Sequence, residues 1–286
     1  MTRSVQLPDG RALEVHELGE PDGFPVLFHH GTPGSGTLYE RWRTPGVRLL
    51  GYDRAGYGGS ARSPGRSVAD VVADVTAVVD ALGLERFATW GLSGGGPHAL
   101  ACAALFDERL TAAASVAGVA PYDVDDLDWL AGMGEGNQRE FALVLAGEEA
   151  LRPALEDERG GLLGLGAEEL RAGMDPHLGE ADRRALTGEL ATYFHGNMSH
   201  ALADGVDGWV DDDLAFARPW GFDVERIERP VLVLQGGDDL MVPPGHGRWL
   251  ARRIPGADAR IEDEHGHLTL VQHLVPDVHA WLLSHG

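Results

Sequence analysis

Residues 87–105 predict a short apolar strand that runs directly into an apolar helix, with Ser93 at the turn between them. Glycines lie on both sides of this serine, at Gly91, Gly94 and Gly95. A serine in such a sharp turn needs these neighbours, because the backbones before and after it pass close together. The turn would leave the Ser93 hydroxyl exposed at the sheet edge. It would also direct the first helix amides, beginning with Gly94 N–H, at a developing oxyanion.

The pattern around Ser93 is weak evidence by itself, because glycine makes up 40 of the 286 residues. A serine that merely caps a helix at a glycine-rich turn is the structural alternative. The context favours a nucleophile, since a strand precedes Ser93, a helix follows it, and groups that could serve as its base and orienting carboxylate come later in the chain.

The rest of the chain alternates strands and helices. The strands are expected over residues 4–7, 12–18, 25–29, 47–52, 86–90, 110–116, 230–236 and 259–262, with a hairpin turn at Pro8-Asp9-Gly10. One helix is expected after an N-cap at Ser67 with Asp70 three residues on, one after Ser93, one over 244–253, and a final one ending near residue 284. Because alternating elements imply parallel pairing, the fold class predicted is α/β, a doubly wound, mostly parallel sheet.

Residues 121–228 predict helices without intervening strands, and we interpret them as a helical cap over a core formed by residues 1–120 and 229–286. Acidic residues cluster near both ends of this cap. Such clusters could bind a metal or a cationic substrate, but no matching histidines accompany them, so they are interpreted as solvated helix starts and loops. The clustered residues are Asp123, Asp125, Asp126 and Asp128, and then Asp211, Asp212 and Asp213.

The formal net charge is −22, and all 23 basic residues are arginine. An acidic surface of this kind repels nucleic acid and anionic membranes, so neither is an expected partner. No stretch has the pattern of a secretory signal or a membrane span, which favours a soluble, cytoplasmic protein. Cys102 is the single cysteine; it can form no intramolecular disulfide, and we expect it to pack in the core. No cofactor and no metal are predicted, and the sequence leaves a homodimer open.

A serine hydroxyl needs a base, and that base needs an orienting carboxylate. Asp238 and Asp239 follow the predicted strand at 230–236, and His265 and His267 follow the next one. Both segments come after strand carboxyl ends, at the sheet edge where Ser93 is also expected. The order Ser, Asp, His differs from that of other serine hydrolases.

Five segments in this order resemble the α/β-hydrolase fold family over nearly the whole chain. They are His30-Gly31-Thr32-Pro33, the motif from Asp53-Arg54 to Ser60, Gly91-x-Ser93-x-Gly95, Gly236-x-x-Asp239-x-x-x-Pro243, and Gly266-His267. The resemblance implies a catalytic triad of Ser93, Asp239 and His267, with an oxyanion hole from the amides of Thr32 and Gly94. Asp238 and His265 remain the alternatives, because a shift of one or two residues within a loop changes the assignment.

Serine at this turn resembles the esterase, lactonase, peptidase and carbon–carbon hydrolase members of the family. It disfavours members that carry aspartate there. We expect a small-molecule substrate and hydrolysis of an ester, lactone or related acyl bond through an acyl-enzyme. A proline iminopeptidase-like aminopeptidase is the nearest alternative, since His30-Gly31-Thr32-Pro33-Gly34 approaches that subfamily's oxyanion motif and an acidic cap could hold an amino group. This chain departs from that subfamily at Thr32, where the subfamily usually has glycine, and at Leu92 and Gly94, where the subfamily's turn residues are bulkier. Carbon–carbon bond hydrolysis and a weakly catalytic receptor on the same fold also stay open.

Overall fold

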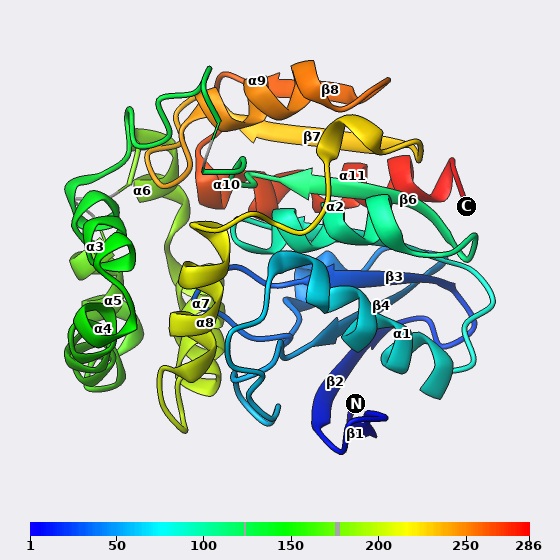
Figure 1. The fold of residues 1–286 in the computed structure, drawn as a ribbon, viewed down its shortest axis with the longest axis horizontal. Helices are drawn as coiled ribbons and strands as arrows, with labels where there is room; N and C mark the ends of the chain where they lie inside the picture. The colour runs from blue at the N-terminus through cyan, green and yellow to red at the C-terminus, as the bar shows by residue number, and fades with distance from the viewer. Residues whose placement is uncertain (123, 175–177) are drawn as a thin grey trace.

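One mixed sheet of eight strands organises the described chain in the computed structural model, which describes all residues except 123 and 175–177 (Figure 1). Across the sheet the strands are β1 (Thr2–Gln6), β2 (Ala12–Gly19), β4 (Val47–Tyr52), β3 (Phe24–His29), β5 (Phe87–Leu92), β6 (Leu110–Val116), β7 (Val231–Gly236) and β8 (Asp258–Glu262). The pairs β1/β2 and β2/β4 are antiparallel, and every later pair is parallel. This arrangement confirms the predicted doubly wound, mostly parallel sheet.

Both faces of the sheet are covered. Along β3, Leu27 packs into one apolar cluster, while Val26 and Phe28 pack into another on the opposite face, as the alternation of side chains along a strand requires. The first cluster also includes residues of α1 (Val71–Ala81), α2 (Gly95–Leu105) and α9 (Pro244–Arg253). The second includes residues of α10 (His267–His273) and α11 (Val275–Leu283).

Helices without strands lie between β6 and β7 in the described chain. They are α3 (Glu135–Ala146), α4 (Glu148–Leu163), α5 (Ala167–Met174), α6 (Glu180–Ala185), α7 (Gly188–Ala201) and α8 (Asp207–Phe216). Figure 1 shows them gathered at one end of the sheet, the end toward which the arrowheads of β6 and β7 point. This helical insertion therefore lies beyond the carboxyl ends of the parallel strands, where α/β folds place their ligand sites.

Several strand ends lie one or two residues from their predicted positions, and two of the predicted helices differ in form. The helix predicted after Ser67 begins with a 3₁₀ turn at Val68–Asp70 before α1, and the Ser67 N–H donates to Asp70 Oδ2 at 2.7 Å. The single final helix is in fact two, α10 and α11, with Pro276 in the first turn of α11. Proline has no N–H to donate to a preceding turn and its ring clashes with the carbonyl four residues earlier, so one helix cannot continue regularly through Pro276.

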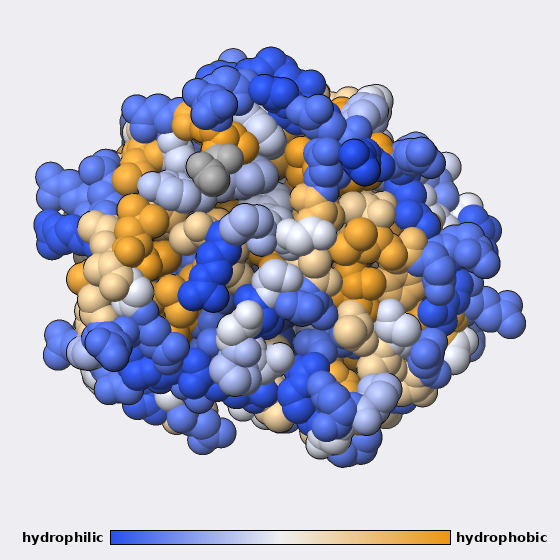
Figure 2. Space-filling model, in the orientation of Figure 1, coloured by the Kyte–Doolittle hydropathy of each residue, from blue (hydrophilic) through white to orange (hydrophobic). Residues whose placement is uncertain are grey.

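The surface agrees with the acidic, polar composition. Figure 2 shows hydrophilic residues around most of the outline of one face, with hydrophobic residues concentrated toward its interior. Cys102 is fully buried, with its Sγ 3.8 Å from His29 Nε2, as expected of a packing residue. Among the described residues, no helix has both the length and the apolar character that crossing a bilayer requires.

Candidate active site

Ser93 follows the last residue of β5, with a backbone φ of 55°. This is the left-handed region, which a non-glycine residue seldom adopts, so the neighbouring structure must hold it there. The Ser93 N–H donates to Val116 O at 2.9 Å. A β-carbon at Gly91 would lie 2.0 Å from Gly95 O, and one at Gly95 would lie 2.1 Å from His29 O. The turn therefore requires glycine at both positions, for the steric reason that the sequence suggests.

Thr32 and Gly94 lie next to each other beside Ser93. A β-carbon at Gly94 would lie 2.4 Å from Thr32 Oγ1, and all three residues line one cavity. Among the described residues, neither the Thr32 nor the Gly94 N–H donates to another backbone carbonyl. The Thr32 hydroxyl donates to Asp212 Oδ2 at 2.8 Å, which fixes the side chain of this loop residue. Two amides thus remain available near the serine, as an oxyanion hole requires.

The structure brings Asp239 and His267 together. Asp239 Oδ2 lies 2.8 Å from His267 Nδ1, and both side chains are buried. Asp239 Oδ1 accepts from the Met241 N–H at 2.9 Å and the Val242 N–H at 2.8 Å, so its carboxylate has a fixed orientation. Burial lowers the pKa of His267, but the charge and hydrogen bond of Asp239 outweigh it and leave this pKa raised. A carboxylate on Nδ1 favours the tautomer whose Nε2 can accept a proton.

The alternative residues have other contacts. Asp238 Oδ2 accepts from the Ala181 N–H, 3.2 Å away at the start of α6 in the helical insertion. The ring of His265 lies 6.0 Å from that of His273. The carboxylate–imidazole contact therefore joins Asp239 to His267, the two residues that the resemblance selects, and not Asp238 to His265.

Asp182, in α6 of the insertion, is a site residue that the sequence analysis missed. Its Oδ2 accepts from the His267 N–H at 2.6 Å, and its Oδ1 accepts from the Leu268 and Thr269 N–H groups at 2.9 Å each. These donors are the first amides of α10, which a helix leaves unpaired. Burial raises the pKa of Asp182. A β-carbon at Gly266 would lie 2.5 Å from Asp182 Oδ2, so glycine makes room for this carboxylate.

The core and the helical insertion therefore contact each other on both sides of the Asp239–His267 pair. Asp238 binds the first turn of the insertion's α6, while Asp182 of α6 binds the first turn of α10, which begins with His267. No local sequence motif predicts these contacts. Asp238 is 57 residues from Ala181, and His267 is 85 residues from Asp182. We refer below to this reciprocal pair of contacts as the α6 latch.

A cavity of about 250 Å³ lies between the sheet edge and the insertion. Ser93, Thr32 and Gly94 belong to its wall. Most of the other lining side chains are apolar or aromatic, as is usual for small-molecule sites. They include Val119, Trp129, Met133, Phe141, Val144, Leu162, Met174, Met198, Trp209, Phe216, Met241 and Val242.

Three carboxylates also line this cavity: Glu140 on α3, Glu158 on α4 and Asp213 on α8. No arginine is among the described lining residues. The Trp209 Nε1–H donates to Glu140 Oε1 at 3.2 Å, and the carboxyl groups of Glu140 and Asp213 lie within hydrogen-bonding reach of each other. Burial, and then the charge of Glu158, raise the pKa of Glu140 to about 7. Burial, and then the charge of Glu140, hold the pKa of Asp213 well above its ordinary value.

The acidic run at 211–213 is where the sequence interpretation was wrong. Asp211, Asp212 and Asp213 are at most 7% exposed and lie within α8, instead of forming a solvated loop. Asp212 is paired with Arg54 and Arg66, each at 2.6 Å. Burial would raise its pKa, but the two guanidinium charges outweigh this and hold the pKa well below the ordinary value.

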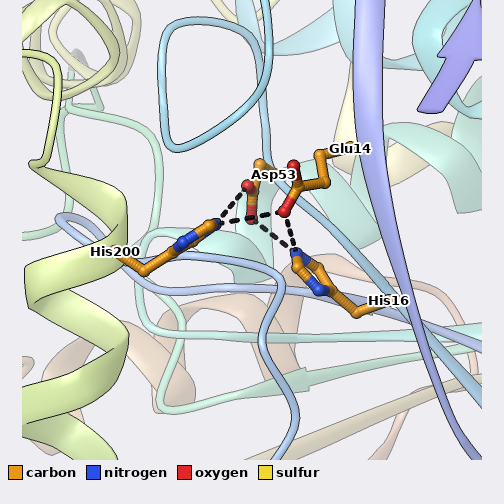
Figure 3. A group of neighbouring side chains, drawn as sticks. All are labelled: Glu14, His16, Asp53 and His200. Carbon is orange, nitrogen blue, oxygen red and sulfur yellow. Dashed lines mark hydrogen bonds and ion pairs between the residues drawn. The ribbon is translucent and has the colours of Figure 1, made fainter. Parts of the chain in front are cut away.

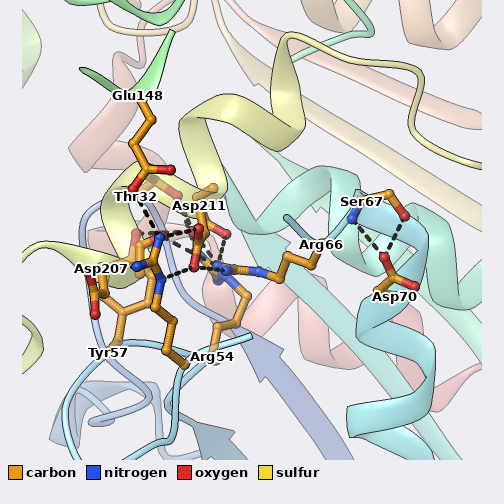
Figure 4. A network of polar contacts seen from close by, with 12 residues as sticks. Thr32, Arg54, Tyr57, Arg66, Ser67, Asp70, Glu148, Asp207 and Asp211 are labelled. Atoms are coloured by element: carbon orange, nitrogen blue, oxygen red, sulfur yellow. Dashed lines mark hydrogen bonds and ion pairs between the residues drawn. The ribbon is translucent and has the colours of Figure 1, made fainter. Parts of the chain in front are cut away.

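Asp211 extends the same polar network toward the surface. Arg62 donates to its two carboxylate oxygens at 2.9 Å each, and Figure 4 shows Arg54, Arg66 and Asp211 converging from different segments. The sequence alone could not reveal this burial, because Arg54, Arg62 and Arg66 follow β4 and are far from the aspartates in sequence. In the other acidic cluster, Asp125, Asp126 and Asp128 are exposed as expected, and Asp123 lies outside the described residues.

Known proteins resemble this chain in sequence and in fold. It is 29% identical over 251 residues to a non-heme chloroperoxidase of Streptomyces lividans, covering 84% of this chain and 83% of that protein. It is 27% identical over 281 residues to a proline iminopeptidase of Neisseria meningitidis, covering 90% of this chain and 87% of that protein. A thermophilic esterase from Thermogutta terrifontis superposes over the whole of both chains with a TM-score of 0.71 at 22% identity, a likeness of fold.

These relatives differ in the reactions that their names state, and the esterase shares the overall fold described above. The sequence profile of the alpha/beta hydrolase fold matches residues 25–274. The matched range begins within β3 and extends to the end of α10, so it includes the insertion as well as the sheet edge. This chain therefore belongs to the alpha/beta hydrolase fold family.

Proposed function

We propose that this protein is a serine hydrolase that cleaves a small carboxylic ester or related acyl bond through an acyl-enzyme on Ser93. The observation that carries the proposal is the 2.8 Å contact between Asp239 and His267, together with a strained Ser93 in the wall of an apolar cavity. Fixed donors, a base with an orienting carboxylate and a cavity are the parts that acyl transfer needs.

In the first half of this reaction, Ser93 Oγ attacks the substrate carbonyl carbon while His267 Nε2 takes the hydroxyl proton. Asp239 stabilises the imidazolium, and the Thr32 and Gly94 amides bind the oxyanion. The tetrahedral intermediate then expels the leaving alcohol, which receives the proton from His267.

In the second half, water attacks the acyl-enzyme. His267 accepts a proton from this water and returns it to Ser93 Oγ as the acid leaves. The complete cycle consumes one water and one ester and releases one alcohol and one acid.

A fluorophosphonate probe followed by intact-mass measurement tests whether Ser93 is activated. We expect one adduct on the wild-type protein and none on Ser93→Ala. The same samples are then assayed with short-chain p-nitrophenyl esters. Labelling with turnover supports the proposal, labelling without turnover favours a receptor or a narrow substrate range, and an absence of labelling contradicts it.

A second candidate, cleavage of an acyl bond in a substrate with a free amino group, is favoured by the acidic side of the cavity. Glu140 and Asp213 form no ion pair with an arginine in the described chain, in contrast to Asp212. A substrate ammonium group would stabilise the ionised form of these two carboxyl groups, whose pKa values are raised in its absence, and the aromatic wall adds favourable contacts with a cation. The proline iminopeptidase relative, by its name, acts on substrates of this kind.

Two substrates of equal size separate these candidates: an aminoacyl ester and the analogue in which hydrogen replaces the amino group. Simple ester hydrolysis predicts equal or better kcat/KM for the analogue without the amine. Aminopeptidase-like activity predicts preference for the aminoacyl ester, together with turnover of an aminoacyl naphthylamide. Turnover of the naphthylamide at a higher kcat/KM than the ester would favour aminopeptidase-like activity over simple ester hydrolysis.

A further inference from the structure

We propose that Glu14, His16, Asp53 and His200 form a binding site for one Zn²⁺ ion that joins the helical insertion to the sheet. Glu14 and His16 belong to β2, Asp53 follows the last residue of β4, and His200 lies on α7 of the insertion. Figure 3 shows both imidazoles directed at the two carboxylates from opposite sides. The four donor atoms all lie within 4.8 Å of one another.

The spacing of the donor atoms fits a tetrahedral ion. Zn–N and Zn–O bonds of about 2.0–2.2 Å place the donors of such a site about 3.3–3.5 Å apart. His16 Nε2 lies 3.3 Å from Asp53 Oδ1 and 3.5 Å from Glu14 Oε1. His200 Nε2 lies 3.5 Å from Glu14 Oε1 and 2.8 Å from Asp53 Oδ2. His16 faces Asp53 Oδ1 and His200 faces Asp53 Oδ2, so binding of one ion requires a movement of these side chains within a cluster whose donor atoms already lie within 4.8 Å of one another.

The backbone brings three of these donors together before any ion binds. Residues 14 and 16 point to the same face of β2, because side chains alternate along a strand. The Asp53 N–H donates to the Glu14 carbonyl at 2.9 Å, which places these two residues directly opposite each other. His200 is then the one donor supplied by the insertion, so its position decides whether the four groups converge.

Supporting hydrogen bonds hold the donors in orientation, as is typical around bound metals. Asp53 Oδ1 accepts from the Gly36 N–H at 2.7 Å, and Asp53 Oδ2 accepts from the Gly59 N–H at 3.2 Å. The second ring nitrogen of His16 lies 3.4 Å from Thr2 Oγ1. Both carboxylate oxygens of Asp53 thus have an amide donor and still face an imidazole.

Two consecutive glycines make room for the cluster. A β-carbon at Gly58 would lie 2.2 Å from Asp53 Oδ2 and 2.7 Å from His200 Nε2. One at Gly59 would lie 2.2 Å from Glu14 Oε2. A larger residue at either position would displace these side-chain ends, so residues 58 and 59 leave room for three of the four donors, Glu14, Asp53 and His200.

The chemistry of the donors favours a first-row transition-metal ion such as Zn²⁺ over an alkaline-earth ion. Among the described residues, Glu14 and Asp53 form ion pairs with these histidines and with no arginine, although the chain contains 23 arginines. Two imidazoles and two carboxylates suit Zn²⁺, whereas Mg²⁺ and Ca²⁺ prefer oxygen donors throughout. The Asp53 side chain is fully buried, while those of Glu14 and His200 are 28% and 33% exposed, which leaves the ion a path from solvent.

Calorimetric titration of metal-free protein with ZnCl₂, with metal content measured on the same samples, tests the site. We expect one Zn²⁺ per chain in the wild type. We also expect affinity to fall about 100-fold or more in His200→Ala and in Glu14→Gln, because even the loss of a supporting contact weakens metal sites by about 10–100-fold. His273→Ala is the matched control, since it removes an exposed histidine from the chain's His265–His273 pair and should change neither value.

Thermal unfolding supplies an independent readout. At Zn²⁺ about 100-fold above its Kd, the melting temperature of the wild type should rise by roughly 5–10 °C. The same addition of Zn²⁺ should leave the melting temperatures of His200→Ala and Glu14→Gln unchanged. If His200→Ala does not fold, Glu14→Gln still tests the site, because glutamine has nearly the same size as the glutamate that it replaces. Equal Zn²⁺ binding by wild type and both variants, or no binding by the wild type, overturns the proposal.

Discussion

The sheet edge and the helical insertion contribute different parts of the candidate active site. Ser93, Asp239 and His267 come from segments after strand carboxyl ends, whereas Glu140, Asp182 and Asp213 come from the insertion. In the proposed reaction, the sheet edge supplies the groups that make and break bonds, and these lie within recognisable local patterns. The insertion supplies the groups proposed to position the base or to face the substrate, and their partners are distant in sequence. Substitutions at the sheet edge should therefore lower the rate with every substrate. The effect of substitutions in the insertion should depend on the substrate, or on how far they displace His267.

The largest effect is expected from Ser93→Ala. Removal of the attacking oxygen should lower kcat for esters by about 10⁶-fold, the loss seen when a triad nucleophile is removed. Because the fold does not depend on this hydroxyl, the melting temperature should stay within a few degrees. The check is steady-state kinetics on a p-nitrophenyl ester, and retention of most activity would place the chemistry elsewhere.

Asp239→Asn should lower kcat by about 10⁴-fold, because an amide on Nδ1 favours the wrong imidazole tautomer. Asp238→Asn is the matched control. The Asp238 carboxylate accepts from the Ala181 N–H, so this variant should keep most of the ester activity. A larger loss in Asp238→Asn than in Asp239→Asn would reverse the assignment of the orienting acid.

Asp182→Ala tests whether the insertion positions the base. Three amides at the start of α10 would lose their acceptor, and we expect kcat to fall by about 10–100-fold with little change in KM. Asp182→Asn keeps an acceptor oxygen and should recover much of the rate. A loss of stability with unchanged kcat in the folded fraction would mean that this residue supports the fold alone.

Asp213→Asn and Glu140→Gln separate substrate recognition from chemistry. For an aminoacyl ester, each should raise KM by about tenfold or more, because a buried charged contact is worth about 1.5–3 kcal/mol. Hydrolysis of the analogue without the amine should change less than about twofold. Asp157→Asn, which removes an exposed carboxylate from α4, is the control. Equal effects on both substrates would contradict an amine-binding role.

The smallest effect is a pH dependence. Burial and the charge of Glu158 raise the pKa of Glu140 to about 7, so the negative charge of the Glu140–Asp213 pair increases as the pH rises from about 6 to about 8. The kcat/KM ratio of the aminoacyl ester to its neutral analogue should therefore rise several-fold over this range. Titration of His267 affects both substrates and cancels in the ratio. A flat ratio would show that Glu140 does not contact the amine.

The sequence predicted the strands of the sheet and the glycine-bounded turn at Ser93 because each of these features is short and local. The steric demand for Gly91 and Gly95 around Ser93, and the order of Ser93, Asp239 and His267, are visible without any knowledge of distant contacts. Asp212 shows the opposite case: its arginine partners lie 158 and 146 residues away, so a buried ion pair looked like a solvated acidic run. The cluster of Glu14, His16, Asp53 and His200 was missed for the same reason, and the sequence analysis predicted no metal.

The α6 latch limits how freely this insertion can be exchanged with that of another family member. An insertion is usually regarded as a module that can be replaced between two strands without disturbing the catalytic framework. Here Asp182 and Gly179 of the insertion fit against Gly266 and Asp238 of the core, where a single added β-carbon would collide. A chimera that keeps the core loops but receives a foreign insertion would lose the acceptor for the His267 amide. In this chain, recombination must therefore transfer α6 together with the loops at residues 236–239 and 263–267.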